Sequence, residues 1–91
     1  MKRYANVWKA IENTPQAAAA MRARADLMIA LQEHLKALKL TQAGSAALLG
    51  VTQPRVSDLM RGKIDLFSVE SLIDMLSRSG IEVKVRLRRA A

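Results

Sequence analysis

Hydrogen-bonding side chains gather within residues 53–58, QPRVSD. The amide of Gln53 can bond twice to adenine, the guanidinium of Arg55 twice to guanine, and the carboxylate of Asp58 can accept from cytosine. Ser57 adds a hydroxyl to the same stretch. If these four residues lie on the outer side of one short helix, that helix carries the chemistry needed to read base edges in the major groove of DNA.

The flanking residues predict two short helices joined by a tight turn. Thr41 can cap the first helix, and Gly50 ends it because glycine enters the left-handed conformation without steric cost. Pro54 suits the first turn of the second helix and disfavours helical angles at the residue before it, so Gln53 is the expected cap. Gly62 ends the second helix.

The inner side of the second helix is apolar. Val56 and Leu59 lie three residues apart and so share one side of a helix, while Val51 fills the angle between the two helices. An ordinary helical hairpin, whose outer side chains are only solvated, would show the same spacing. Spacing alone therefore leaves both interpretations open.

The stretch 40–63, LTQAGSAALLGVTQPRVSDLMRGK, resembles the helix-turn-helix of the XRE/Cro-repressor superfamily. The matching features are Leu-Thr-Gln at 40–42, a small residue at 46, the turn glycine at 50, Thr-Gln at 52–53 and Gly-Lys at 62–63. Residues 50–80, GVTQPRVSDLMRGKIDLFSVESLIDMLSRSG, more closely resemble the HigA-type antitoxin branch, and the likeness covers roughly residues 23–87. Gly44 and Ser45 depart from the pattern, because better helix formers are expected there; Gly44 should cost about 1 kcal/mol relative to alanine.

The resemblance implies a mainly α-helical, lambda-repressor-like bundle of about five helices that binds operator DNA and represses transcription. Together with the outward geometry it predicts phosphate contacts from Gln42, Thr52, Arg61 and Lys63. Base contacts are predicted for Gln53, Arg55, Ser57 and Asp58. The HigA-type likeness adds a second role, in which the protein neutralises a RelE-like toxin (HigB-like in this branch) and represses the shared operon. The alternative is a stand-alone XRE-family regulator without a toxin partner.

Composition narrows the function classes. The 91 residues make one domain, and the formal net charge of +7 favours a polyanionic partner such as double-stranded DNA. The absence of cysteine excludes disulfides, thiol catalysis and thiolate metal sites. His34 is the one histidine and no carboxylates cluster, so we expect a structural histidine and neither an enzyme nor a bound cofactor or metal. RNA binding is disfavoured because no aromatic stacking platform is evident.

Residues 1–14 are expected to form an N-terminal arm or short helix. Its apolar residues recur at spacings of three and four: Tyr4, Val7, Trp8 and Ile11. This side could fold back on the domain or dock onto another protein, and Lys2 and Arg3 could instead touch phosphate.

The sequence also predicts a cytoplasmic protein. Polar residues interrupt the N-terminal segment at Asn6, Lys9 and Glu12, so it lacks the apolar core of a signal peptide. No apolar run approaches the roughly 18 residues of a membrane span, so no membrane association is expected.

Residues 15–80 are predicted to form the DNA-binding domain, with the motif at 41–62. Thr14 and Pro15 start a helix over about 15–38, whose apolar stripe is Leu27, Leu31, Leu35 and Leu38. Between the motif and the last helix, three residues are expected to enter the core: Ile64, Leu66 and Phe67. The last helix is capped by Ser68, is ended by Gly80 and should bury Val69, Leu72, Ile73, Met75 and Leu76.

Residues 81–91 are predicted to be a dimerisation strand with a basic tail. Charged residues alternate with four apolar ones, which are Ile81, Val83, Val85 and Leu87. A lone strand leaves its backbone groups unpaired, so the simplest partner is the same strand of a second copy across a two-fold axis. A strand from the toxin or from the N-terminal arm is the alternative. A dimer would place two recognition helices about 34 Å apart, one DNA turn, on a palindromic operator.

Overall fold

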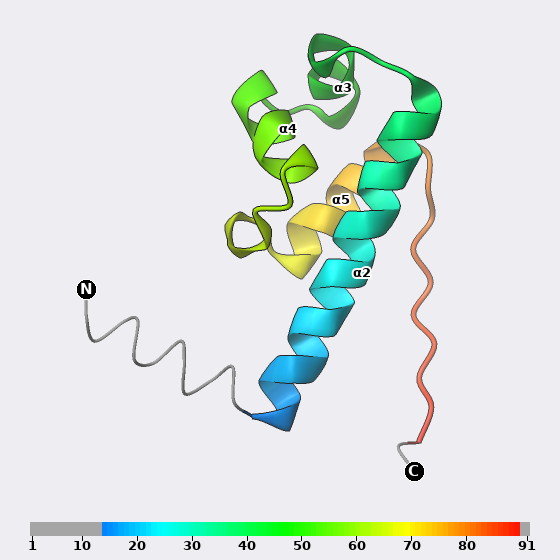
Figure 1. Cartoon of the computed structure of the whole chain (residues 1–91). Coiled ribbons are helices and arrows are strands. Elements are labelled where there is room, and N and C mark those ends of the chain that lie inside the picture. The colour runs from blue at the N-terminus through cyan, green and yellow to red at the C-terminus, as the bar shows by residue number, and fades with distance from the viewer. Residues whose placement is uncertain (1–13, 90–91) are drawn as a thin grey trace, which may run out of the picture.

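The helices follow one another along the chain with short connections. The structure, a computed structural model, describes residues 14–89. In chain order its elements are α2 (Pro15–Leu38), α3 (Gln42–Leu49), α4 (Gln53–Met60), the 3-10 turn η1 (Ile64–Leu66) and α5 (Val69–Arg78). Figure 1 shows α5 packed along α2, with α3 and α4 placed around the C-terminal end of α2. The prediction of a mainly helical fold is confirmed, although this part of the chain holds four α-helices instead of about five.

The long helix α2 has the predicted bounds. The Thr14 side chain accepts a hydrogen bond from the Ala17 N–H at 3.0 Å, and Pro15 occupies the first turn. The helix ends where Lys39 turns left-handed at φ 55° and its N–H bonds to the Lys36 carbonyl. The predicted N-terminal arm, residues 1–14, lies outside the described residues except for Thr14.

The core joins all four helices. It comprises Met28, Leu31, Leu35, Leu49, Leu59, Phe67, Leu72, Met75 and Leu76. The predicted stripe on α2 is correct at Leu31 and Leu35, whereas Leu38 is 41% exposed and Met28 is buried instead. Leu38 lies in the last turn of α2, where the chain leaves for α3, so no helix covers it.

The two motif helices have the predicted turn between them. The Thr41 side chain accepts from the Gly44 N–H at 3.0 Å, and Gly50 adopts φ 69°. The Val51 N–H then bonds to the Ala46 carbonyl at 3.0 Å. A Cβ at position 44 would lie 3.3 Å from the Thr41 hydroxyl oxygen, so glycine relieves crowding at the cap.

The predicted cap of α4 is wrong by one residue. Thr52, with φ −79° and ψ 160°, is the cap, and its side chain accepts from the Arg55 N–H at 3.3 Å. Gln53 is the first residue within the helix. Thr52 is the cap because its short side chain places the hydroxyl within hydrogen-bonding distance of the N–H three residues later. Gln53, although it precedes proline, adopts the first helical position.

The connection between α4 and α5 buries fewer side chains than predicted. Phe67 is 2% exposed and joins the core, and Ile64 is half-buried, but Leu66 is 48% exposed. The tight η1 turn points successive side chains in different directions, so the Leu66 side chain stays exposed while its carbonyl accepts a hydrogen bond from Arg55. Ser68 caps α5 as predicted, in a reciprocal pair of hydrogen bonds with Ser71.

The C-terminal segment after Gly80 is extended and turns back from the end of α5 (Figure 1). Ile81 and Val83 pack against the core, while Val85 and Leu87 are 77% and 87% exposed. No strand forms anywhere in residues 14–89, so the predicted C-terminal strand is absent from the single chain. A strand needs a backbone partner, and this segment has none within one copy. Within the same range, no helix is both long and apolar enough to cross a membrane.

Candidate nucleic-acid interface

Helix α4 has one side buried in the core and one side exposed to solvent. Val56 and Leu59 are 2% and 0% exposed and pack inward, as predicted. Gln53 is exposed at the start of the helix, and Ser57 is half-buried one turn later. The polar side of α4 is therefore available for contact near its N-terminal end.

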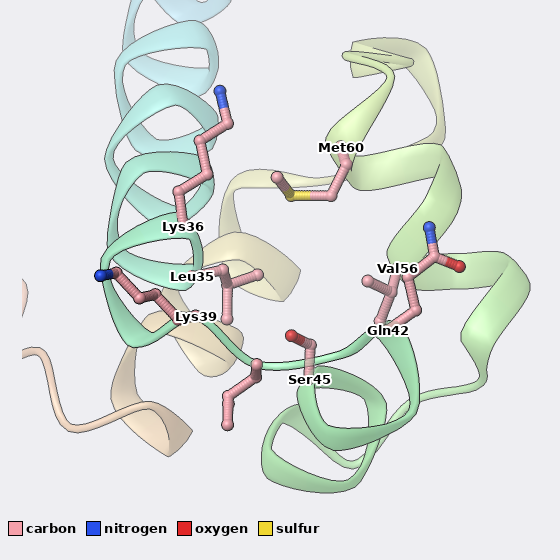
Figure 2. Close-up of a pocket in the computed structure, with 8 residues that line it drawn as sticks. Leu35, Lys36, Lys39, Gln42, Ser45, Val56 and Met60 are labelled. Atoms are coloured by element: carbon pink, nitrogen blue, oxygen red, sulfur yellow. The ribbon is translucent and has the colours of Figure 1, made fainter.

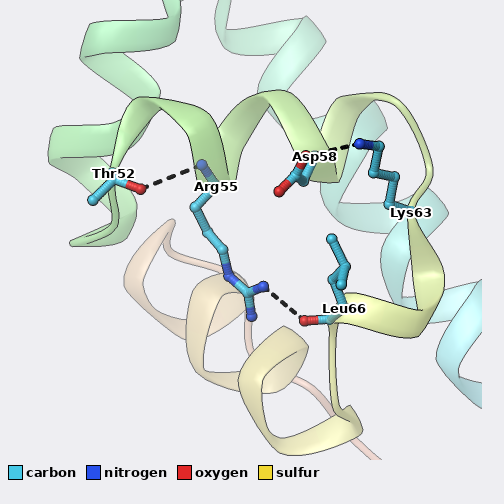
Figure 3. Close-up of polar contacts among 5 residues, drawn as sticks. All are labelled: Thr52, Arg55, Asp58, Lys63 and Leu66. Carbon is cyan, nitrogen blue, oxygen red and sulfur yellow. Dashed lines mark hydrogen bonds and ion pairs between the residues drawn. The ribbon is translucent and has the colours of Figure 1, made fainter. Parts of the chain in front are cut away.

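Arg55 does not project with these residues. Its guanidinium donates to the Leu66 carbonyl at 2.7 Å and lies 3.9 Å from the centroid of the Phe67 ring. Figure 3 shows the side chain running from α4 toward the chain between η1 and α5. Arg55 thus ties α4 to the residues that follow it, and a base contact by this guanidinium would require both interactions to break.

Asp58 is also engaged. Its carboxylate lies 3.4 Å from the Lys63 ammonium, and both side chains are partly exposed (Figure 3). The pair joins α4 to the turn after it. Because an exposed ion pair contributes little, Lys63 can exchange it for a phosphate at small cost.

The four predicted phosphate-contact residues lie at helix ends. Gln42 begins α3, Thr52 caps α4, and Arg61 and Lys63 follow α4; all four are exposed. The Thr52 oxygen accepts the capping bond, which leaves its hydroxyl hydrogen free to donate to phosphate. This placement agrees with the predicted roles, which remain predictions.

Sequence reasoning missed one residue that positions the recognition helix. The Gln32 side-chain amide on α2 donates to the Leu59 carbonyl near the end of α4 at 2.8 Å. No sequence signal marks this contact, because 27 residues separate the two partners. A similar long-range contact joins His34 to the Ser79 carbonyl, with Nε2 at 3.0 Å, consistent with the structural role predicted for this histidine.

Gln32→Ala should lower the free energy of unfolding by about 1 kcal/mol, because the partly buried Leu59 carbonyl loses a donor. Urea denaturation measures the change. Glu33→Ala, at an exposed position of the same helix, is the matched control and should have little effect. Equal stability of the two variants would show that the contact does not hold α4.

Among residues 14–89 no three His, Cys, Asp or Glu side chains come together as a metal site would require. What the fold does bring together is a pair of short helices, α3 and α4, at a glycine turn, with their inner sides in one core. This arrangement is a helix-turn-helix.

The comparisons place the chain in a family. Residues 10–88 match the helix-turn-helix domain family. A solved structure of a protein proposed to be an XRE family transcriptional regulator is 34% identical, with a TM-score of 0.74, over 80% of this chain and 82% of that one. The chain therefore belongs to the XRE family of helix-turn-helix proteins, which confirms that part of the predicted resemblance. No protein of curated function matches it.

Proposed function

We propose that this XRE-family protein binds specific operator DNA through α4 and represses transcription. The observation that carries the proposal is α4 itself, whose apolar side is fixed in the core while Gln53 remains exposed on the other side. The net charge of +7 favours the DNA polyanion. We also propose that the protein is cytoplasmic, as the sequence predicts.

The proposed contacts divide into two groups. Gln53, Ser57 and Asp58 contact base edges, and Asp58 must first release Lys63. Phosphates are held by Gln42, Thr52, Arg61 and Lys63. Arg55, predicted from its residue type to contact guanine, is proposed to position α4 through its contacts with Leu66 and Phe67.

Selection of bound sequences from a random pool of duplexes tests the function. We expect enrichment of one palindromic site whose half-sites lie about one helical turn apart. A pool that shows no enrichment would contradict sequence-specific binding. Enrichment of a single, non-repeated half-site would support sequence-specific DNA binding but contradict binding as a two-fold dimer.

Lys63→Ala should weaken binding to all duplexes alike and reduce the slope of log affinity against log salt by about one, because one phosphate contact is lost. Titrations of the selected duplex over a range of salt concentrations measure the slope. Arg22→Ala removes one charge from an exposed position of α2 and is the control. An unchanged slope for Lys63→Ala would remove this residue from the interface.

We further propose that residues 81–89 pair with the same segment of a second copy. The segment is already extended, and its apolar residues Val85 and Leu87 are exposed in the single chain. Pairing would satisfy its open backbone groups and cover these side chains. A strand supplied by a toxin or by the N-terminal arm would satisfy the same groups and is the alternative.

The HigA-type antitoxin role is proposed on the likeness of residues 50–80 to that branch. Helix α2 also offers an exposed surface to a protein partner. Its first turns extend past the other helices (Figure 1), and Ile29 further along it is 50% exposed. Co-expression with the product of an adjacent small basic open reading frame tests this role. Co-purification as a stable complex is expected, whereas a solitary gene or failure to form a complex would favour the stand-alone regulator.

A further inference from the structure

A cavity of about 360 Å³ lies where the end of α2 meets α3 and α4. Its apolar wall comes from Leu35 of α2 and from Val56 and Met60 of α4 (Figure 2). This volume falls in the range of small-molecule sites, which are mostly apolar with a few placed polar groups.

Ser45 presents a hydroxyl at the α3 side of the cavity. The residue is 4% exposed, and, besides the bonds within α3, its one hydrogen bond within the described chain is made by its backbone N–H, to the Thr41 carbonyl. Figure 2 shows it directed into the space between α2 and α4. Among residues 14–89 the buried side-chain atom that lacks a partner is Arg24 Nε, so the Ser45 hydroxyl is accessible to a molecule in the cavity. A residue needed only for small size would be alanine, as at the neighbouring buried Ala46, because alanine is the better helix former.

Positive charge lies at the rim. Lys36 and Lys39, in the last turn of α2 and just after it, both line the cavity, and none of the side chains lining it is acidic. Figure 2 shows the Lys36 ammonium on the α2 side of the opening, whereas Lys39 is directed away in this view. Lys36 is exposed and has no ion-pair partner within residues 14–89. The rim therefore favours an anion.

We propose that this cavity binds a small amphipathic carboxylate that carries a second oxygen on its chain. The carboxylate pairs with Lys36, the methylene chain packs on Leu35, Val56 and Met60, and the second oxygen accepts a hydrogen bond from Ser45. This assignment gives the unpartnered hydroxyl a partner and covers the apolar wall. It also accounts for Ser45, the departure from the helix-turn-helix pattern that DNA binding does not explain.

Binding at this position would reach the DNA interface. Gln42, a proposed phosphate contact, lines the same cavity, and Val56 belongs to the recognition helix. A carboxylate bound at Lys36 adds negative charge to the cavity that Gln42 also lines, so we expect the ligand to weaken DNA binding, and DNA to weaken ligand binding by the same factor. This coupling rests on the proposed function, whereas ligand binding to the free protein does not.

Three probes separate the two polar anchors: 8-hydroxyoctanoate has both groups, octanoate lacks the hydroxyl, and octan-1-ol lacks the charge. Titration of the full chain, followed by amide NMR shifts, should show 8-hydroxyoctanoate binding about 5- to 10-fold more tightly than either of the others, since one added hydrogen bond or ion pair is worth that much. The largest shifts are expected around Ser45 and Val56.

Two variants assign the anchors. Lys36→Gln should weaken both carboxylates several-fold and leave octan-1-ol unchanged, and Ser45→Ala should abolish the advantage of 8-hydroxyoctanoate over octanoate. Arg22→Gln is the charge control, about 21 Å from Lys36 along the same helix. Each result compares the affinities of different probes for the same variant. A loss of stability would weaken all three probes alike and would therefore leave these ratios unchanged.

Equal affinity for the three probes, or shifts centred away from Ser45 and Val56, would overturn the proposal. Its failure is separable from that of the DNA-binding function. Binding to the cavity is tested on the free protein. Only the expected weakening of DNA binding is tested with DNA, by titrating the selected duplex with and without 8-hydroxyoctanoate. If the random pool yields no site but 8-hydroxyoctanoate binds with the expected ratios, the cavity stands and the DNA proposal falls.

Discussion

Arg55→Ala should lower the free energy of unfolding by about 2 kcal/mol. It should also weaken DNA binding, by the same factor for every duplex whatever its sequence. The stability loss follows from the charged hydrogen bond to Leu66 and the stacking on Phe67, both of which alanine removes. The uniform loss of affinity follows because α4 would no longer be held against the chain after η1. Urea denaturation measures the first effect, and competition between single-base variants of the selected duplex measures the second.

Two further variants sharpen the interpretation of Arg55. Arg55→Lys keeps the charge but loses the planar fork and the stacking, so it should resemble alanine more than arginine. Arg61→Ala removes a charge from an exposed position just after α4 and should leave stability unchanged. A loss of preference at one base pair, with stability intact, would instead make Arg55 the guanine contact that its residue type predicts.

The double substitution Val85→Asp with Leu87→Asp should convert a dimer into a folded monomer. Both side chains are exposed in the single chain, so the monomer loses no core packing. In a dimer paired across a two-fold axis, however, the aspartates of the two copies would repel one another, and the apolar contacts of Val85 and Leu87 would be lost. Because two linked half-sites bind far more tightly than one, affinity for a palindromic duplex should fall about 100-fold or more.

Sedimentation equilibrium measures the assembly, and titration of the palindromic duplex measures the affinity. The control is Lys84→Gln with Arg86→Gln, which lowers the net charge by the same two units while keeping the apolar residues. If the aspartate variant remains dimeric, residues 81–89 are not the dimer contact. If the unaltered protein is itself monomeric, the two-fold proposal fails.

Local interactions made much of this fold predictable. The starts of α2, α3 and α5 were each indicated by a capping residue, and the cap bonds an N–H only three positions away. The turn glycine at 50 was likewise predictable, because its φ of 69° suits glycine in any surroundings. Even the one local error, Gln53 in place of Thr52 as cap, moved a helix start by a single position.

The sequence by itself determined the class of protein, through helix ends, apolar spacing and the pattern of residues 40–63. Tertiary structure alone decided what the outer side chains do. Arg55 meets Leu66 and Phe67, Gln32 meets Leu59, and Ser45 faces a cavity between three helices. A cap depends on neighbours three residues away, whereas these contacts depend on how helices cross, and no local pattern encodes a crossing.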